Sequence, residues 1–164
     1  MSVRTSILTV SDRSARGERA DASGPAIRDL VSTQKWEIVR MDIVPDDLGK
    51  IQQTLETWAD TGDQDIILTT GGTGFAPRDV TPEATLSVVD RLAPGITEAM
   101  RNASLNITKH AMLSRGIAGI RGVTLIVNLP GSPKAAIENL EVVLSVIPHA
   151  VHLLRGNPDA EQQH

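Results

Sequence analysis

The chain has 164 residues, of which 40% are hydrophobic and 22% charged, as in a single globular domain. Its formal net charge of -4 argues against a nucleic-acid-binding or membrane-surface protein, because such proteins depend on a clustered positive face. The absence of cysteine excludes disulfides, thiolate metal sites and cysteine nucleophiles. We expect one domain over residues 1–156 and a polar tail over residues 157–164. Because neither a signal peptide nor an apolar membrane-spanning run is recognisable, we expect a cytoplasmic location.

Short β-branched runs alternate along the chain with segments of helical period, which is typical of β-α-β units around a mostly parallel sheet. The first strand is predicted over residues 3–10, and Ser23 is expected to cap the first long helix. A second strand is predicted over residues 37–44. The turn Pro45-Asp46-Asp47 then leads into a helix whose apolar residues recur at spacings of three and four.

The second half of the chain repeats this alternation. A third strand is predicted over residues 65–70, followed by a glycine loop and a helix that Thr81 is expected to cap and that ends near Leu92. Another helix, a glycine-punctuated connection over residues 115–122 and a fourth strand over residues 123–129 come next. One last helix is expected to kink at Pro148. We therefore predict an α/β fold in three layers, with a mostly parallel sheet between helices.

Charged and small residues follow each predicted strand, at the edge where parallel sheets bind ligands. They are Ser11-Asp12-Arg13, Asp46-Asp47, the run Gly71-Gly72-Thr73-Gly74 with Arg78-Asp79, and Pro130-Gly131-Ser132-Pro133. Converging carboxylates favour Mg²⁺, and glycine turns let backbone N–H groups approach an anion. The pattern indicates a site for a phosphorylated ligand, in particular a nucleotide with Mg²⁺.

Simpler interpretations of single residues stay open at this point. Asp46 or Asp47 can be only a helix cap, Asp79 only a turn residue, and Ser132 only the cap of the last helix. A glycine turn alone is a weak signal. The sequence lacks a P-loop motif, and Pro77 stands where a dinucleotide-binding motif has its third glycine.

Longer motifs resemble one known family. The run over residues 68–85, from Leu68-Thr69-Thr70-Gly71 through Arg78-Asp79-Val80-Thr81-Pro82-Glu83, is similar to the signature of molybdopterin-binding domains. The segments over residues 9–13, 111–115 and 128–133 agree with it, as does Pro45-Asp46. Within the family the chain resembles the MogA-type molybdopterin adenylyltransferases and the G domains of their plant and animal counterparts. MoaB-type proteins share the fold but tend to differ over residues 75–80.

This resemblance implies a reaction in which Mg-ATP and molybdopterin give adenylylated molybdopterin and pyrophosphate. It implies that Asp46 and Asp79 are catalytic and hold Mg²⁺. The substrate- and nucleotide-binding residues expected from the strand ends and the resemblance together are Ser11, Asp12, Gly71, Gly72, Thr73, Gly74, Arg78, Ser114, Arg115, Pro130, Gly131, Ser132 and Pro133. A homotrimer that passes its product to a molybdate-inserting enzyme is also implied, with no nucleic-acid or membrane partner. The alternative is a non-catalytic or MoaB-type molybdopterin-binding module of the same fold.

Overall fold

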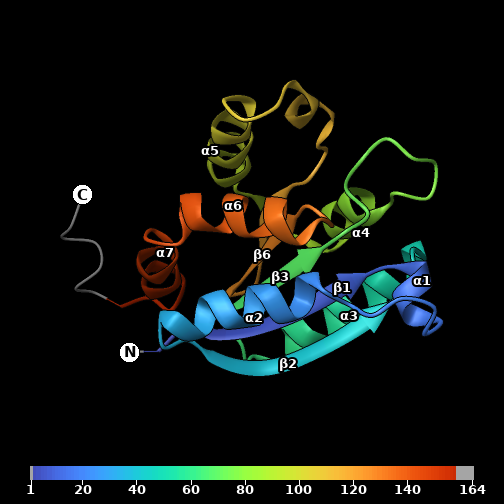
Figure 1. Cartoon of the computed structure of the whole chain (residues 1–164). Coiled ribbons are helices and arrows are strands. Elements are labelled where there is room, and N and C mark those ends of the chain that lie inside the picture. Colours follow the sequence, from blue (N-terminus) through green and yellow to red (C-terminus); the bar gives the residue numbers. More distant parts are fainter. Residues whose placement is uncertain (1, 158–164) are drawn as a thin grey trace.

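The computed structural model describes residues 2–157, and the fold of these residues is built on one six-stranded sheet (Figure 1). The strands are β1 (Arg4–Val10), β2 (Glu37–Val44), β3 (Ile66–Thr70), β4 (Arg91–Leu92), β5 (Ala118–Arg121) and β6 (Thr124–Leu129). Their order is β2-β1-β3-β6-β5-β4. The first four in this order are parallel, and β5 and β4 are antiparallel to their neighbours. The prediction of a mostly parallel sheet is confirmed.

Helices cover both faces of the sheet, so the predicted three layers are confirmed (Figure 1). On one face, alternate residues of β1, β3 and β6 pack against α2 (Ser23–Thr33), α5 (Pro94–Leu105), α6 (Pro133–Val143) and α7 (Ile147–Leu154). On the other face, the intervening residues pack against α3 (Leu48–Thr61) and α4 (Thr81–Val88). Every residue of β3 and β6 is buried, because helices cover both faces of the sheet. The short α1 (Asp12–Ala15) and η1 (Lys109–Leu113) lie in connections.

The parallel strands end at a common edge. Their register pairs Val10 with Val44, Thr9 with Thr70, and Thr70 with Leu129. The loops that leave β1, β2, β3 and β6 therefore start side by side, which brings together the segments that the sequence marks as functional.

Two helix starts differ from the prediction in their capping. Helix α2 begins at Ser23, but the Asp21 carboxylate accepts the hydrogen bond from the Gly24 N–H at 3.2 Å. Helix α4 begins at Thr81 without a side-chain cap, because the Thr81 hydroxyl donates instead to the Gly71 carbonyl at 2.9 Å. Both polar groups are used to fix loops at the edge of the sheet.

The segment after α4 is a correction to the sequence prediction. The helix ends at Val88 and not near Leu92, because the chain turns there to pair with β5. The Asp90 N–H donates to the Ile120 carbonyl at 2.7 Å, and the Gly122 N–H donates to the Asp90 carboxylate at 2.7 Å. The connection predicted over residues 115–122 thus contains a strand.

The single last helix that the sequence predicts is two helices, α6 and α7, bent by 64°. Pro148 does not kink a continuous helix but lies in the first turn of α7, where a missing N–H group leaves no bond unmade. In the described part of the chain no single helix is long and apolar enough to cross a membrane. The bent pair would pass that test only if its two halves were taken together. Most of the tail predicted over residues 157–164 lies outside the described residues.

Candidate active site

Three loops each bring one carboxylate to the common edge of the sheet. Asp12 follows β1, Asp46 follows β2, and Asp79 lies in the loop after β3. The first two hold each other through reciprocal bonds: the Asp12 N–H donates to the Asp46 carboxylate at 3.0 Å, and the Asp46 N–H donates to the Asp12 carboxylate at 2.8 Å. This pairing locks the β1 and β2 loops together.

The neighbouring Asp47 has a separate task. Its carboxylate accepts a hydrogen bond from the Lys50 N–H at 2.8 Å and caps α3. The two alternatives left open for Asp46 and Asp47 are thereby divided between them: the second is the cap, and the first faces the site. Likewise Ser132 caps α6 through the Ala135 N–H at 3.3 Å while it also lines the site.

The carboxylates of Asp46 and Asp79 repel each other. Burial and the nearby charge of Asp79 raise the pKa of Asp46 above its ordinary value. Arg78 forms an ion pair with Asp12, which offsets part of the negative charge. The charge of Arg78 is paired with Asp12 and does not lie between Asp46 and Asp79. A cation placed between these two carboxylates would therefore relieve their repulsion.

The first two glycines of the loop after β3 have a conformation and a space that only glycine tolerates. Gly71 has φ +102°, and a Cβ there would lie 2.3 Å from the Val10 carbonyl oxygen. Gly72 has φ +68°, and its Cβ would lie 2.4 Å from the Thr81 hydroxyl and 3.2 Å from the Asp46 carboxylate. These glycines let the loop backbone pass directly over the end of the sheet and beside Asp46.

The carboxylates and the glycine loop surround a cavity of about 600 Å³, which we call the carboxylate cavity. Predicted site residues that line it are Ser11, Asp12, Asp46, Gly71, Gly72, Arg78, Asp79, Gly131, Ser132 and Pro133. Arg19, Asp21 and Ser23 also line it and were not among the predicted site residues. The available signal was their place in the loop after β1, which carries basic and helix-capping residues.

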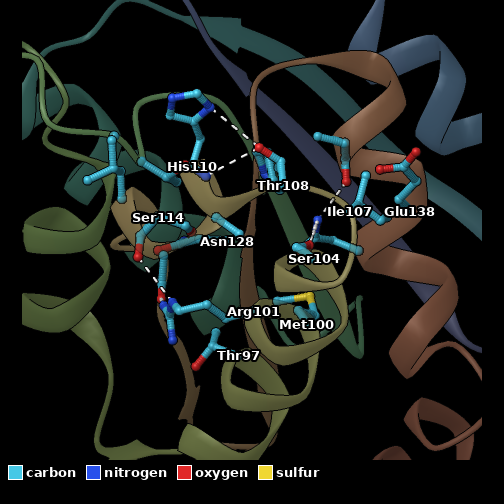
Figure 2. A pocket seen from close by; sticks show the side chains of 18 residues that line it. Thr97, Met100, Arg101, Ser104, Ile107, Thr108, His110, Ser114, Asn128 and Glu138 are labelled. Carbon is cyan, nitrogen blue, oxygen red and sulfur yellow. Dashed lines mark hydrogen bonds between the residues drawn. The ribbon is translucent and has the colours of Figure 1, made fainter.

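A second cavity of about 290 Å³, which we call the helix cavity, lies beside α5 and α6 (Figure 2). The predicted residues Thr73, Gly74, Ser114 and Pro130 line it. The sequence analysis missed its helical walls, where Thr97, Met100, Arg101 and Ser104 come from α5 and Glu138 from α6 (Figure 2). A buried polar residue in each of two apolar patterns was the available signal: Asn128 in β6 and Asn139 in α6 are 2% and 8% exposed.

One wall separates the two cavities. Gly71 and Gly72 face the carboxylate cavity and Thr73 and Gly74 face the helix cavity. The loop after β6 is divided in the same way, and the Thr70 hydroxyl donates to the Pro130 carbonyl at 2.7 Å to join the two loops. Ligands bound in the two cavities would therefore lie next to each other, on either side of these shared loops. Among the predicted residues, Arg115 lines neither cavity, and its side chain turns to the loop that carries Asp79.

This arrangement of glycine loop, paired carboxylates and adjoining cavities agrees with a sequence comparison. Residues 6–149 match the family described as the probable molybdopterin binding domain. The chain belongs to this molybdopterin-binding family. The resemblance seen in the loop motifs is thus confirmed over most of the chain.

Several members of the family are similar to this chain over nearly all of its length. The chain is 48% identical to gephyrin of Dictyostelium discoideum over 162 residues, which cover 93% of this chain but only 22% of gephyrin. It is 42% identical to the molybdopterin adenylyltransferase of Helicobacter pylori strain J99, with 94% of this chain and 89% of that protein covered. The solved structure of the molybdopterin biosynthesis enzyme MoaB of Thermus thermophilus superposes with a TM-score of 0.89 at 52% identity, covering 95% and 98% of the two chains.

A hard divalent cation fits the residues of this molybdopterin-binding domain. Among residues 2–157, no three histidine or acidic side chains cluster as a complete metal site. Asp46 and Asp79 supply two carboxylates near enough for the charge of one to raise the pKa of the other. Mg²⁺ in enzymes commonly binds one or two carboxylates and takes its other oxygen ligands from water and substrate phosphates. The donor set therefore fits a hard divalent cation that takes its remaining ligands from water and phosphate oxygens.

Proposed function

We propose that this chain is a magnesium-dependent molybdopterin adenylyltransferase, which transfers AMP from ATP to molybdopterin and releases pyrophosphate. The observation that carries the proposal is the pair of cavities on either side of one glycine loop, with Asp46 and Asp79 in the larger. A reaction between two large substrates needs adjoining spaces whose boundary brings the reacting groups together.

The carboxylate cavity suits the phosphates of ATP. Arg13, Arg19 and Arg78 line it and supply positive charge, and the backbone of Gly71 and Gly72 leaves room for close approach. When bound by Asp46 and Asp79, Mg²⁺ would neutralise the charge of the phosphate oxygens and of the pyrophosphate that leaves.

The helix cavity suits the pterin of molybdopterin. Its wall combines apolar side chains such as Met100 and Ile107 with polar groups such as Ser104, Asn128 and Ser114 (Figure 2). A flat heterocycle with several hydrogen-bonding groups needs such a mixed lining. In this placement the terminal phosphate of molybdopterin points across the glycine loop toward the nucleotide.

The chemistry requires positioning more than a covalent nucleophile. An oxygen of the molybdopterin phosphate attacks the α-phosphorus of ATP and forms a new P–O bond. The bond from that phosphorus to the oxygen bridging to the β-phosphate breaks, and pyrophosphate leaves with the bonding electrons. Because the attacking phosphate is already largely ionised near neutral pH, the site needs no strong base. The loops and arginines of the chain hold the two polyanions in line.

The relatives support both this proposal and its main alternative. A protein that this chain matches over most of both lengths is named a molybdopterin adenylyltransferase, whereas a solved structure at 52% identity is named MoaB. The alternative is a module that binds molybdopterin without transferring AMP. The retained run Arg78-Asp79-Val80-Thr81-Pro82-Glu83, with Asp79 in the carboxylate cavity, favours the enzyme.

Incubation of the purified chain with ATP, Mg²⁺ and molybdopterin tests the proposal. We expect pyrophosphate release that depends on all three components, and a loss of about 100-fold in turnover for Asp79→Asn, which keeps size but removes charge. Asp90→Asn is the matched control, because Asp90 also accepts one backbone N–H bond but lines neither cavity. Tight binding of molybdopterin by the wild type without pyrophosphate release would contradict the enzyme and favour the module.

Three further features, expected from the sequence or from the resemblance, remain predictions. They are a homotrimeric assembly, a cytoplasmic location and transfer of the product to an enzyme that inserts molybdate. Sedimentation of the purified chain and capture of a molybdate-inserting enzyme by it would check the first and the third.

A further inference from the structure

Arg115 connects the two halves of the proposed site without facing either cavity. It follows Ser114, which lines the helix cavity, and its N–H donates to the Thr73 carbonyl at 2.8 Å. Its guanidinium donates to the Gly74 carbonyl at 2.7 Å and to the Asp79 carbonyl at 2.7 Å, and forms an ion pair with Glu83. Arg115 thus contacts the loop that carries Asp79 at Thr73 and Gly74 and at Asp79, and it also contacts α4 through Glu83.

Between its two ends the loop is also anchored by Arg78, which forms an ion pair with Asp12 of the neighbouring loop. Residues 75–78 are exposed, and Phe75 projects into solvent at 67% exposure. Inside the loop the Ala76 N–H donates to the Asp79 carboxylate at 3.0 Å, and the Asp79 N–H donates to the Ala76 carbonyl at 2.9 Å. These bonds shape the loop locally. The bonds from Arg115 hold the backbone of Asp79 itself to another segment of the chain, which the exposed Arg78 side chain does not do.

Of the two carbonyls that Arg115 binds, one belongs to Asp79 itself and the other to Gly74. A Cβ on Gly74 would lie 2.9 Å from the Asp79 carboxylate oxygen, so this carboxylate lies against Gly74. Holding the Gly74 and Asp79 carbonyls therefore sets where the carboxylate stands relative to Asp46. A planar guanidinium can hold two carbonyls and a carboxylate together in one fixed geometry, which an ammonium group cannot.

Arg115 is itself held in place from the other side. Arg101 of α5 donates to the Ser114 carbonyl at 3.1 Å and to the Gly116 carbonyl at 3.0 Å, bracketing Arg115 in the chain (Figure 2). Glu83 and the charge of Asp79 raise the pKa of Arg115, and Arg115 in turn lowers the pKa of Glu83. The guanidinium is a fixed positive group that is already bonded to protein.

We infer that Arg115 is a positioning residue for adenylyl transfer, which places the Asp79 carboxylate by bonding the Gly74 and Asp79 carbonyls. This role differs from the substrate-binding role that the sequence suggests, and it rests on the proposed function. It separates Arg115 from Arg13, Arg19 and Arg78, whose side chains line the carboxylate cavity.

Arg115→Gln and Arg115→Lys test the inference, with Glu83→Gln as the matched control that removes one partner but leaves both carbonyl bonds. We expect Arg115→Gln to lower kcat by about 10- to 100-fold while the KM for ATP changes by less than about threefold, because a displaced Asp79 weakens the reaction more than binding. Arg115→Lys should recover only part of the loss, and Glu83→Gln should stay within about threefold of the wild type. The Mg²⁺ concentration for half-maximal rate should rise in the Arg115 variants alone.

Amide hydrogen exchange without substrate supplies a readout that does not depend on enzyme activity. We expect faster exchange at Ala76 and Asp79 in Arg115→Gln, with unchanged exchange in β1, β3 and β6 as the check that the fold is intact. If the wild type releases no pyrophosphate but the loop still loosens, the proposed function fails and the structural part of the inference stands. A raised KM for ATP at unchanged kcat would show that Arg115 binds the substrate directly, and unchanged loop exchange would show that it does not hold the loop. Either result would overturn the inference.

Discussion

Asp46 and Asp47 show how neighbouring identical side chains acquire different tasks. The first lines the carboxylate cavity, is partly buried and has a raised pKa, whereas the second is exposed and caps α3. A carboxyl group whose pKa is higher in the folded than in the unfolded state costs stability as the pH rises above its unfolded pKa, and the full cost is reached above the folded pKa. The charge of Asp46 therefore costs the folded protein stability at neutral pH, which fits the cation-holding role that we propose for it.

Replacing each of these two residues by asparagine should separate activity from stability. We expect Asp46→Asn to lower turnover by about 100-fold, and its melting temperature near neutral pH to equal or exceed that of the wild type. Asp47→Asn should keep both properties, because asparagine is also a good helix cap. Turnover with ATP and molybdopterin and melting without ligands measure the two effects. A wild-type rate for Asp46→Asn would remove this carboxylate from the proposed chemistry.

The sequence was informative about these residues because strand ends are easy to locate. Four apolar runs predicted four parallel strands, and the residues that follow them meet at one edge. Whether Asp46 or Asp47 caps α3 depends on the rotation of the loop, which short-range pattern does not determine. The helix cavity was missed for a similar reason: α5 and α6 are brought together by tertiary packing, and only polar residues within apolar patterns hinted at it.

At the scale of elements, the predictions that failed concern short or interrupted segments. Strand β4 has two residues and β5 four, so neither shows a pattern of its own, and they form because they extend the sheet beside β6. The break between α6 and α7 falls before Pro148, although the apolar spacing continues through it. Helical periodicity predicts which side is buried and does not reveal a bend that keeps that side inward.

The glycine loop is the element on which the site depends most, and Gly71→Ala should disrupt it. The alanine Cβ would meet the Val10 carbonyl oxygen at 2.3 Å in a backbone of φ +102°, so β1 or the loop must move. We expect a loss of roughly 3 kcal/mol or more in the free energy of unfolding, together with lost activity. Gly95→Ala is the control, since Gly95 lies in α5 with no atom within 4 Å of an added Cβ. It should be neutral or stabilise by roughly 0.5 kcal/mol, and urea unfolding compares the two. Equal stabilities would contradict the close approach of Gly71 to β1.

At the scale of the whole molecule, the two edges of the sheet have different tasks. The edge where β1, β2, β3 and β6 end carries both cavities, with carboxylates that repel each other and with exposed loops. The opposite edge carries Asp65, which is 3% exposed and accepts bonds from the Arg4 N–H at 2.7 Å and from the Arg4 and Arg155 guanidinium groups at 2.9 and 2.8 Å. This carboxylate joins the start of the first strand to the segment just after α7, at the edge of the sheet opposite the two cavities.

The Asp65 cluster predicts how the molecule responds to acid. Burial alone would raise the pKa of Asp65, but the bonds from Arg4 and Arg155 outweigh it and lower the pKa below its ordinary value. A carboxyl group with a lowered folded pKa stabilises the fold above its unfolded pKa, and this contribution is lost as the pH falls from there through the folded value. Asp65→Asn should therefore cost roughly 3 kcal/mol near neutral pH, because it replaces the buried carboxylate that accepts bonds from both arginines by a neutral amide.

The difference between wild type and Asp65→Asn should shrink as the pH falls below about 4, where the ordinary aspartate becomes protonated in the unfolded chain. Urea unfolding of both proteins across this range measures it. Asp60→Asn is the control, because Asp60 also pairs with an arginine, Arg121, but is exposed, and it should cost much less. Turnover of folded Asp65→Asn should match the wild type, since Asp65 lies at the edge opposite the cavities. A stability difference that stays constant into acid would mean that the charge of Asp65 is not what joins the two ends of the chain.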